Sequence, residues 1–228
     1  MATDNNDQSG NVLFLILIAV ALFAALSYAV TQSTSGGGDA RKESNSIIIG
    51  QISQYVASID AAITKIKILN GCDNLEISFE RSPFDGSSSY FNPNSPSNFK
   101  CHVFHPSGGG AFHSETAPAG NGWMYGKNFG VRGSTMAEAI MVTRGFDREL
   151  CLEISKTFAG LNYIPYYSNV STVGNGAVDG TYSTNPAYLM LRDTSNSILN
   201  GSDRPLIGCA ENRNYTDSYA FYSTMLIN

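Results

Sequence analysis

Four residues of the types that bind zinc lie within one short stretch of the chain. His102, His105 and His113 are the three histidines of the sequence, and Glu115 follows closely behind them. Three imidazoles and a carboxylate are a suitable first coordination shell for zinc. A site of this kind would make the chain a periplasmic, membrane-tethered, metal-dependent hydrolase.

The spacing of the histidines argues against convergence on one metal. It does not match the helix-borne H-E-x-x-H pattern, and Gly108 to Gly110 predict a flexible turn between the histidines. Alternation in a strand around Cys101 also places His102 and His105 on opposite faces. We therefore predict no metal and no cofactor, and the hydrolase is kept as an alternative function.

The other common catalytic patterns are missing from the sequence. There is no G-x-S-x-G motif, and the glycine triplet lacks the Lys and the Ser or Thr of a phosphate-binding loop. An acidic, glycine-rich stretch around Asp179 has oxygens that suit calcium, but it has no defined ligand pattern and is expected to be a solvated loop. The sequence thus predicts a protein that is not an enzyme.

The chain contains an even number of cysteines. They have no C-x-x-C pair and no histidine spaced for a zinc ribbon, so two disulfides in an oxidising compartment are expected, with four buried free thiols as the alternative. Of the three possible pairings we expect the sequential one. Its loops of 29 and 58 residues would each contribute about 3.5–4 kcal/mol. The four residues are Cys72, Cys101, Cys151 and Cys209.

Composition limits the possible partners. The chain has 228 residues, of which 43% are hydrophobic and 14% charged, with a net charge of −5. This length suits one domain with an appendage. Without a basic stripe for phosphates, nucleic acid is not an expected partner.

The apolar stretch near the N-terminus predicts a membrane-spanning helix over residues 11–31. Val12 to Val30 contains no charge and is long enough to cross a hydrocarbon core. A cleaved signal peptide is the alternative, but the first ten residues contain no Lys or Arg. Retention as a single-pass anchor is expected. One face carries small residues four apart, which suits self-association of helices in lipid, and these are Ala21, Ala25 and Ala29.

Two signals disagree about the side of the membrane on which the main domain lies. Arg41 and Lys42 follow the span, and by the positive-inside rule they weakly favour the cytoplasm. The expected disulfides favour an oxidising compartment. Because the cysteines are the stronger signal, we expect residues 31–228 to be periplasmic or extracellular.

The remaining sequence predicts an α+β protein. A Gly-rich linker is expected over 32–46, and an amphipathic helix over 47–71, with Asp39 as a possible N-cap. The helix has one apolar seam and ends at Asn70-Gly71. The seam consists of Ile48, Ile52, Tyr55, Ile59, Ile63, Ile66 and Leu69.

A disulfide-bearing head over 72–228 should contain a small, mainly antiparallel sheet. Strands are expected at 75–80 and 135–143, and a helix at 147–158 is expected to begin after Asp147 as N-cap. An extended loop with brief strands should cover 159–204. A terminal hairpin is then predicted from segments 205–210 and 218–227.

The order of these segments resembles type IV pilins and the pseudopilins of type II secretion. A polar leader over 1–10 ends in Gly10, an apolar helix follows at once, and then come an amphipathic helix and a disulfide-bearing domain. The resemblance implies cleavage between Gly10 and Asn11 by a leader peptidase, and helix packing in the core of a filament. Asn11 and Leu15 stand where the family usually has Phe and Glu, so the resemblance is to a minor or atypical subunit. A tethered binding module is a further alternative.

Overall fold

The computed structural model describes residues 9–33, 37–88, 90–130, 137–167, 195, 205–212 and 219–226. The chain divides into two units, Met1–Ser46 and Ile47–Asn228, which are described separately. The boundary between them lies within the second helix.

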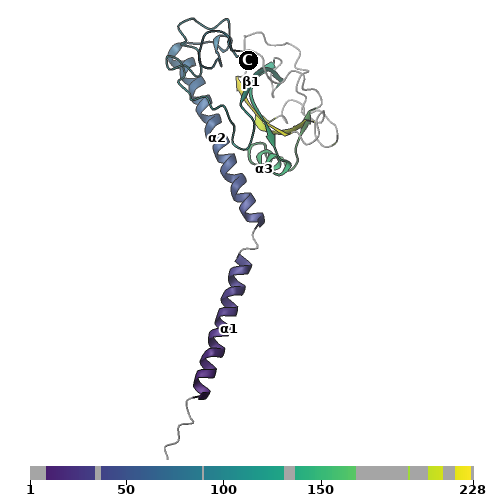
Figure 1. Ribbon diagram of the computed structural model, residues 1–228. Coiled ribbons are helices and arrows are strands. Elements are labelled where there is room, and N and C mark those ends of the chain that lie inside the picture. The colour runs from purple at the N-terminus through teal and green to yellow at the C-terminus, as the bar shows by residue number, and fades with distance from the viewer. Residues whose placement is uncertain are drawn as a thin grey trace, which may run out of the picture. The chain divides into compact units, whose positions relative to one another are not determined.

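The first unit contains helix α1, Ser9–Ser33, drawn in purple in Figure 1. At about 1.5 Å per residue its 25 residues span about 37 Å. Every side chain from Val12 to Ala29 is exposed, including those of eleven large apolar residues and Tyr28. The expected N-terminal apolar helix is therefore present, and it is long and apolar enough to cross a membrane.

Helix α2, Gly37–Asn70, is longer than the sequence predicted. Residues 37–46, expected to be a linker, are helical, and Asp39 lies inside the helix and is not its N-cap. Gly37 and Gly38 stand in the first turn, where the backbone N–H groups have no intrahelical acceptor in any case. Glycine therefore interrupts the helix less at this position than it would in the interior.

The second half of α2 provides one side of the hydrophobic core. Its predicted seam is buried at Ile52, Ile59, Ile63 and Ile66, but Leu69 is 72% exposed, so the seam ends one turn earlier than predicted. The predicted C-terminus at Gly71 is confirmed. Gly71 has φ +64° and the Cys72 N–H donates to the Ile66 carbonyl oxygen, as in a glycine-capped helix end.

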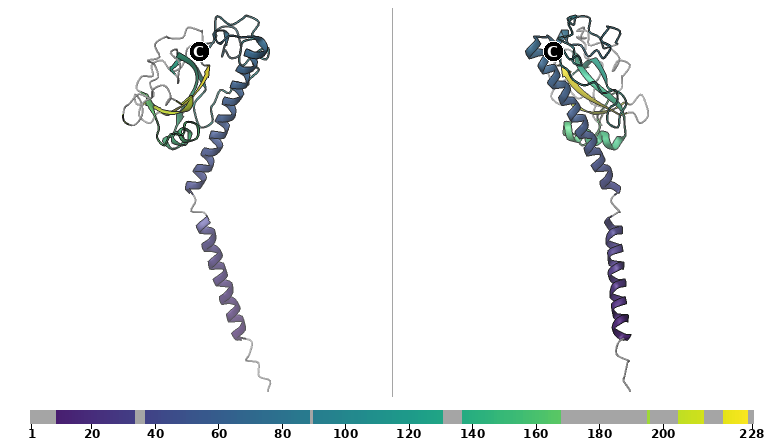
Figure 2. Two further views of the ribbon diagram at one scale, coloured as in Figure 1. Left: turned by 180° about the vertical axis from the view of Figure 1, so that it is seen from behind. Right: turned by 60° about the vertical axis from the view of Figure 1, so that its left-hand side comes forward.

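A five-stranded sheet faces α2 (Figures 1 and 2). Its order is β1-β2-β5-β4-β3, and all neighbours are antiparallel except β3 and β4. The stacked rings of Tyr55 and Trp123, with centroids 4.8 Å apart, join α2 to the start of the sheet. The strands are β1 Met124–Gly130, β2 Ala137–Phe146, β3 Tyr166–Tyr167, β4 Ile207–Asn212 and β5 Tyr219–Leu226.

The α+β class, the strand at 135–143 and the terminal hairpin are confirmed by β2, β4 and β5. The strand predicted at 75–80 is wrong. Residues Asn74–Glu76 form a short 3₁₀ helix instead, and after it only Ser78 makes a bridge, to His102. The Asp73 side chain accepts from the Leu75 N–H, and the Glu76 side chain accepts from the Asp73 N–H. This capping box favours the 3₁₀ helix over a strand.

Helix α3, Arg148–Ala159, and both disulfides match the sequence prediction. Asp147 Oδ1 accepts from the Leu150 N–H at 2.8 Å, and Gly160 ends the helix with φ +67°. Cys72 is bonded to Cys101, and Cys151 of α3 is bonded to Cys209 of β4. The second bond joins α3 to β4, and α3 packs on both β4 and β5.

Candidate functional site

The structure separates His113 from the other two histidines. His113 Nε2 lies 3.3 Å from Arg81 Nη1, and its Nδ1 lies 3.4 Å from the Tyr125 hydroxyl. Burial lowers the pKa of His113 to about 4, and the Arg81 charge acts in the same direction. A neutral imidazole beside a guanidinium accepts a hydrogen bond, so His113 has a structural role here.

His105 is held by aromatic rings and by the backbone. Its ring stacks on Phe99 with centroids 4.6 Å apart and meets the edge of Phe84 at 4.8 Å. Its Nδ1 accepts from the Ser107 N–H at 3.1 Å. The ring centre lies 6.5 Å from that of His102, and Glu115 is exposed.

The four predicted ligands therefore do not form a metal shell. Among the residues described by the structure, the only group of three potential ligands within ligand distance is Cys72, Glu76 and Cys101. Both sulfurs of that group are already bonded to each other. The Asp179 stretch, the candidate calcium loop, lies outside the described residues.

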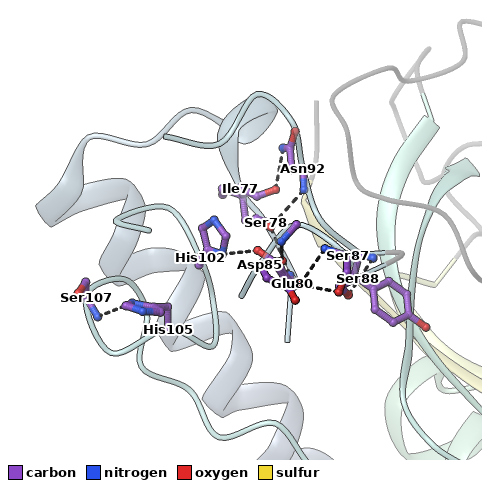
Figure 3. Close-up of polar contacts among 12 residues, drawn as sticks. Ile77, Ser78, Glu80, Asp85, Ser87, Ser88, Asn92, His102, His105 and Ser107 are labelled. Carbon is purple, nitrogen blue, oxygen red and sulfur yellow. Dashed lines mark hydrogen bonds and ion pairs between the residues drawn. The ribbon is translucent and has the colours of Figure 1, made fainter. Parts of the chain in front are cut away.

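In place of the histidine cluster, the structure pairs His102 with Glu80, a residue that the sequence did not indicate. Both side chains are buried, Glu80 completely and His102 to 1% exposure. Figure 3 shows them facing each other, with His102 Nδ1 3.4 Å from Glu80 Oε2. Glu80 Oε1 accepts from the Gly86 N–H at 2.6 Å.

This pair is incompletely hydrogen-bonded. Neither Glu80 Oε2 nor His102 Nδ1 makes a hydrogen bond of acceptable geometry. Burial lowers the pKa of His102 to about 4, and repulsion from His105 adds to the effect. Near neutral pH the imidazole of His102 is therefore uncharged.

A cavity of about 420 Å³ opens above the Glu80–His102 pair. Two of its walls, Phe84 and Phe99, have φ values of 58° and 60°, in the left-handed region that bulky residues rarely adopt. Such a conformation costs about 1–3 kcal/mol per residue and persists only where the surrounding structure imposes it. The lining residues are Glu80, Phe84, Asp85, Gly86, Phe91, Pro93, Ser95, Pro96, Ser97, Phe99 and His102.

The glycine triplet that follows His105 is tightly packed and does not form the predicted flexible turn. The N–H groups of Gly108 and Gly109 donate to the carbonyl oxygens of His105 and His102, both at 2.9 Å. A Cβ on Gly108 would overlap the His102 carbonyl oxygen and approach the Phe99 carbonyl oxygen to 2.8 Å. The triplet thus lets the chain fold back closely and hold His102 in position.

We expect Gly108→Ala to lower the free energy of unfolding by about 1–3 kcal/mol, because backbone atoms must move to admit the methyl group. Urea unfolding of the full chain in detergent measures the change. Gly50→Ala is the matched control. Gly50 lies inside α2 with nothing within 4 Å of an added Cβ, so alanine there should stabilise the protein by about 0.5–1 kcal/mol. An equal, small effect of both changes would contradict the packed turn.

A second cavity, of about 520 Å³, lies beside α2. Tyr55 and Trp123 line it, but Trp123 is only 2% exposed and also meets Phe221 edge-on at 6.0 Å. The Tyr55 and Tyr125 hydroxyls are 3.0 Å apart, and burial raises the pKa of both phenols. These aromatic residues therefore fasten α2 to the sheet.

The residues predicted for processing and helix packing all lie in α1. Gly10 and Asn11 are within its first turn. Ala21, Ala25 and Ala29 are exposed on the helix. Comparison with protein families, with curated proteins and with solved structures finds no match to this chain.

Proposed function

We infer that the chain is a membrane-anchored, pilin-like structural subunit that assembles into an extracytoplasmic filament or secretion pseudopilus through its N-terminal helices. The observation that carries this proposal is α1. Eighteen consecutive residues, Val12–Ala29, form a helix that is apolar on every side and 0% buried within the chain. Such a surface is stable only in lipid or against other apolar helices.

The second helix supports the same architecture. α2 is also long and apolar enough to cross a membrane, but its apolar seam is buried in the head. It therefore serves as the core helix of that unit. The two disulfides fit a head domain in an oxidising compartment, outside the cytoplasmic membrane. A leader peptidase acting between Gly10 and Asn11 would release the filament-forming subunit.

The small residues of α1 provide the assembly surface in this proposal. Ala21, Ala25 and Ala29 are spaced by four, and a face of small residues lets helix backbones approach closely in lipid. A simple tether needs no such face. Self-association should therefore be sensitive to side-chain size on this face and insensitive to it on the opposite face.

We expect Ala25→Leu to reduce crosslinking between subunits several-fold while leaving membrane insertion unchanged. Lysine-directed crosslinking in isolated membranes measures self-association, since Lys42 is exposed shortly after α1. A carbonate wash measures insertion. Ala19→Leu, about 120° around the helix from Ala25, is the matched control and should leave both readouts at the level of the unmodified chain.

Two results would overturn parts of this proposal. Equal crosslinking of the Ala25→Leu and Ala19→Leu variants would mean that α1 only anchors the chain and does not self-associate through its alanine face. Recovery of a soluble mature chain that begins near Val30, identified by mass spectrometry, would make the segment a cleaved signal peptide.

A further inference from the structure

The cavity of about 520 Å³ beside α2 is lined by side chains that a ligand can reach. Gln51, Gln54 and Ser58 are exposed, and their spacing of three and four residues places them on one face of the helix. The loop of residues 112–118 supplies further surface residues. Among these, Phe112 is 81% exposed and Thr116 is also exposed.

The polar groups on the helix side of the cavity can bond to a ligand. Gln51 and Gln54 are exposed, and each side-chain amide has two N–H donors and one carbonyl acceptor. The Ser58 hydroxyl donates to the Tyr55 carbonyl oxygen at 2.7 Å, so the Ser58 oxygen can still accept. The cavity thus offers several donors and acceptors that carry no charge.

A half-buried aromatic ring in the cavity is fixed in position. The Tyr55 ring stacks on Trp123, and the Tyr55 hydroxyl lies 3.0 Å from the Tyr125 hydroxyl. The same hydroxyl accepts from the Ser114 N–H at 3.3 Å. A ring held by these contacts loses little freedom when a ligand binds, which favours affinity. Phe112 adds a second ring at the surface.

The charge of the lining selects a neutral ligand. The described residues that line the cavity include no Asp, Glu, Lys, Arg or His, so a charged group bound there would have no ionic partner. Amides and hydroxyls beside aromatic rings suit a sugar, because sugar hydroxyls both donate and accept while the C–H face of a pyranose ring is apolar. The volume is within the range of small-molecule sites.

We propose that this cavity binds a neutral saccharide of one or two pyranose rings. The sugar hydroxyls bond to the amides of Gln51 and Gln54, and the apolar face of one ring lies against Phe112. All the residues involved belong to the unit Ile47–Asn228, so this binding does not depend on assembly through α1.

The test uses the full chain in a polyoxyethylene detergent, which has no sugar headgroup. Isothermal titration calorimetry is performed with cellobiose, maltose and lactose. Sorbitol, a polyol without a ring, is the matched ligand. We expect saturable binding of at least one disaccharide and none of sorbitol. The fluorescence of Trp123, the one tryptophan of the chain, should change over the same concentration range, because its ring stacks on Tyr55.

Two substitutions test the proposed contacts. Gln54→Ala should weaken disaccharide binding by about threefold to tenfold, because hydrogen bonds are lost. Phe112→Ala should weaken it by about fivefold, because the ring no longer contacts the sugar. Both residues are exposed, so the fold is expected to be retained. Thr64→Ala and Ile68→Ala change exposed residues of α2 that do not line the cavity, and they should leave binding unchanged.

Three outcomes would overturn the inference. They are the absence of binding of all three disaccharides to the unmodified chain, equal binding of a disaccharide and sorbitol, and binding that neither Gln54→Ala nor Phe112→Ala weakens. Sedimentation velocity separates a sugar site from a contact between subunits. Self-association that Phe112→Ala abolishes, without disaccharide binding, would reassign the cavity to a second copy of the chain.

Discussion

Replacing both Cys151 and Cys209 with alanine is expected to lower the free energy of unfolding by about 4 kcal/mol. The bond between them closes a loop of 58 residues, and the chain-entropy cost of leaving such a loop open is of that size. Both sulfurs are also fully buried between α3 and β4. Urea unfolding of the full chain in detergent measures the change, followed by the fluorescence of Trp123, the one tryptophan of the chain.

The other disulfide provides the comparison. Replacing Cys72 and Cys101 opens a loop of 29 residues, and the expected loss is slightly smaller, about 3.5 kcal/mol. A loss below about 1 kcal/mol for the longer loop would mean that the reduced, unfolded chain remains compact, which contradicts the loop-closure argument.

Phe79→Ala is expected to destabilise the head by about 3–5 kcal/mol, the usual range for removing a buried phenylalanine. Phe79 is 1% exposed and stacks on Tyr125 with ring centroids 5.0 Å apart. It also meets the edge of Phe104 at 6.4 Å, so its loss leaves a cavity between several rings. The same urea unfolding experiment measures the effect.

Phe112→Ala is the matched control for this change. Phe112 is 81% exposed, so its removal should alter the free energy of unfolding by less than about 0.5 kcal/mol. Similar decreases in the free energy of unfolding for Phe79→Ala and Phe112→Ala would mean that Phe79 is not part of the core of the head.

The elements that the sequence predicted correctly have local signals. The seam of α2 repeats every three to four residues, Asp147 and Gly160 cap α3 within a turn of its ends, and the terminal hairpin has an aromatic-rich second strand. The sequential disulfide pairing also follows from chain proximity. Each of these signals depends on residues close together in the sequence, and that is why it could be interpreted without a structure.

The errors have local causes as well. Residues 37–46 were expected to be a linker because of their glycines, but two of these stand at the helix start, where they cost little. Residues 75–80 alternate between apolar and polar side chains, as a strand does. The reciprocal hydrogen bonds between Asp73 and Glu76 instead stabilise a 3₁₀ helix at Asn74–Glu76. Strand β1 was missed because its glycines and lysine weaken the alternation.

The Glu80–His102 cavity could not be predicted from the sequence. Glu80 follows Phe79 in an alternating segment, where a glutamate is normally solvent-exposed, whereas it is fully buried in the structure. Its contact with His102 depends on the close turn through Gly108 and Gly109 and on the Ser78–His102 bridge. Such contacts arise only when distant segments pack, and they leave no periodic pattern in the chain.

The two disulfides also determine how the head would respond to a pull along the chain. Each bond encloses its own segment, of 29 and 58 residues, and the stretch between Cys101 and Cys151 lies outside both. Force applied between α2 and a C-terminal attachment would pass through the disulfide bonds and leave the enclosed segments unstretched. Fully extended, these two segments would be about 100 Å and about 200 Å long. The strands that lie outside both loops are β1 and β2, between the two bonds, and β5, after Cys209, so an oxidised head under tension would lengthen by opening the β1-β2-β5 side of its sheet.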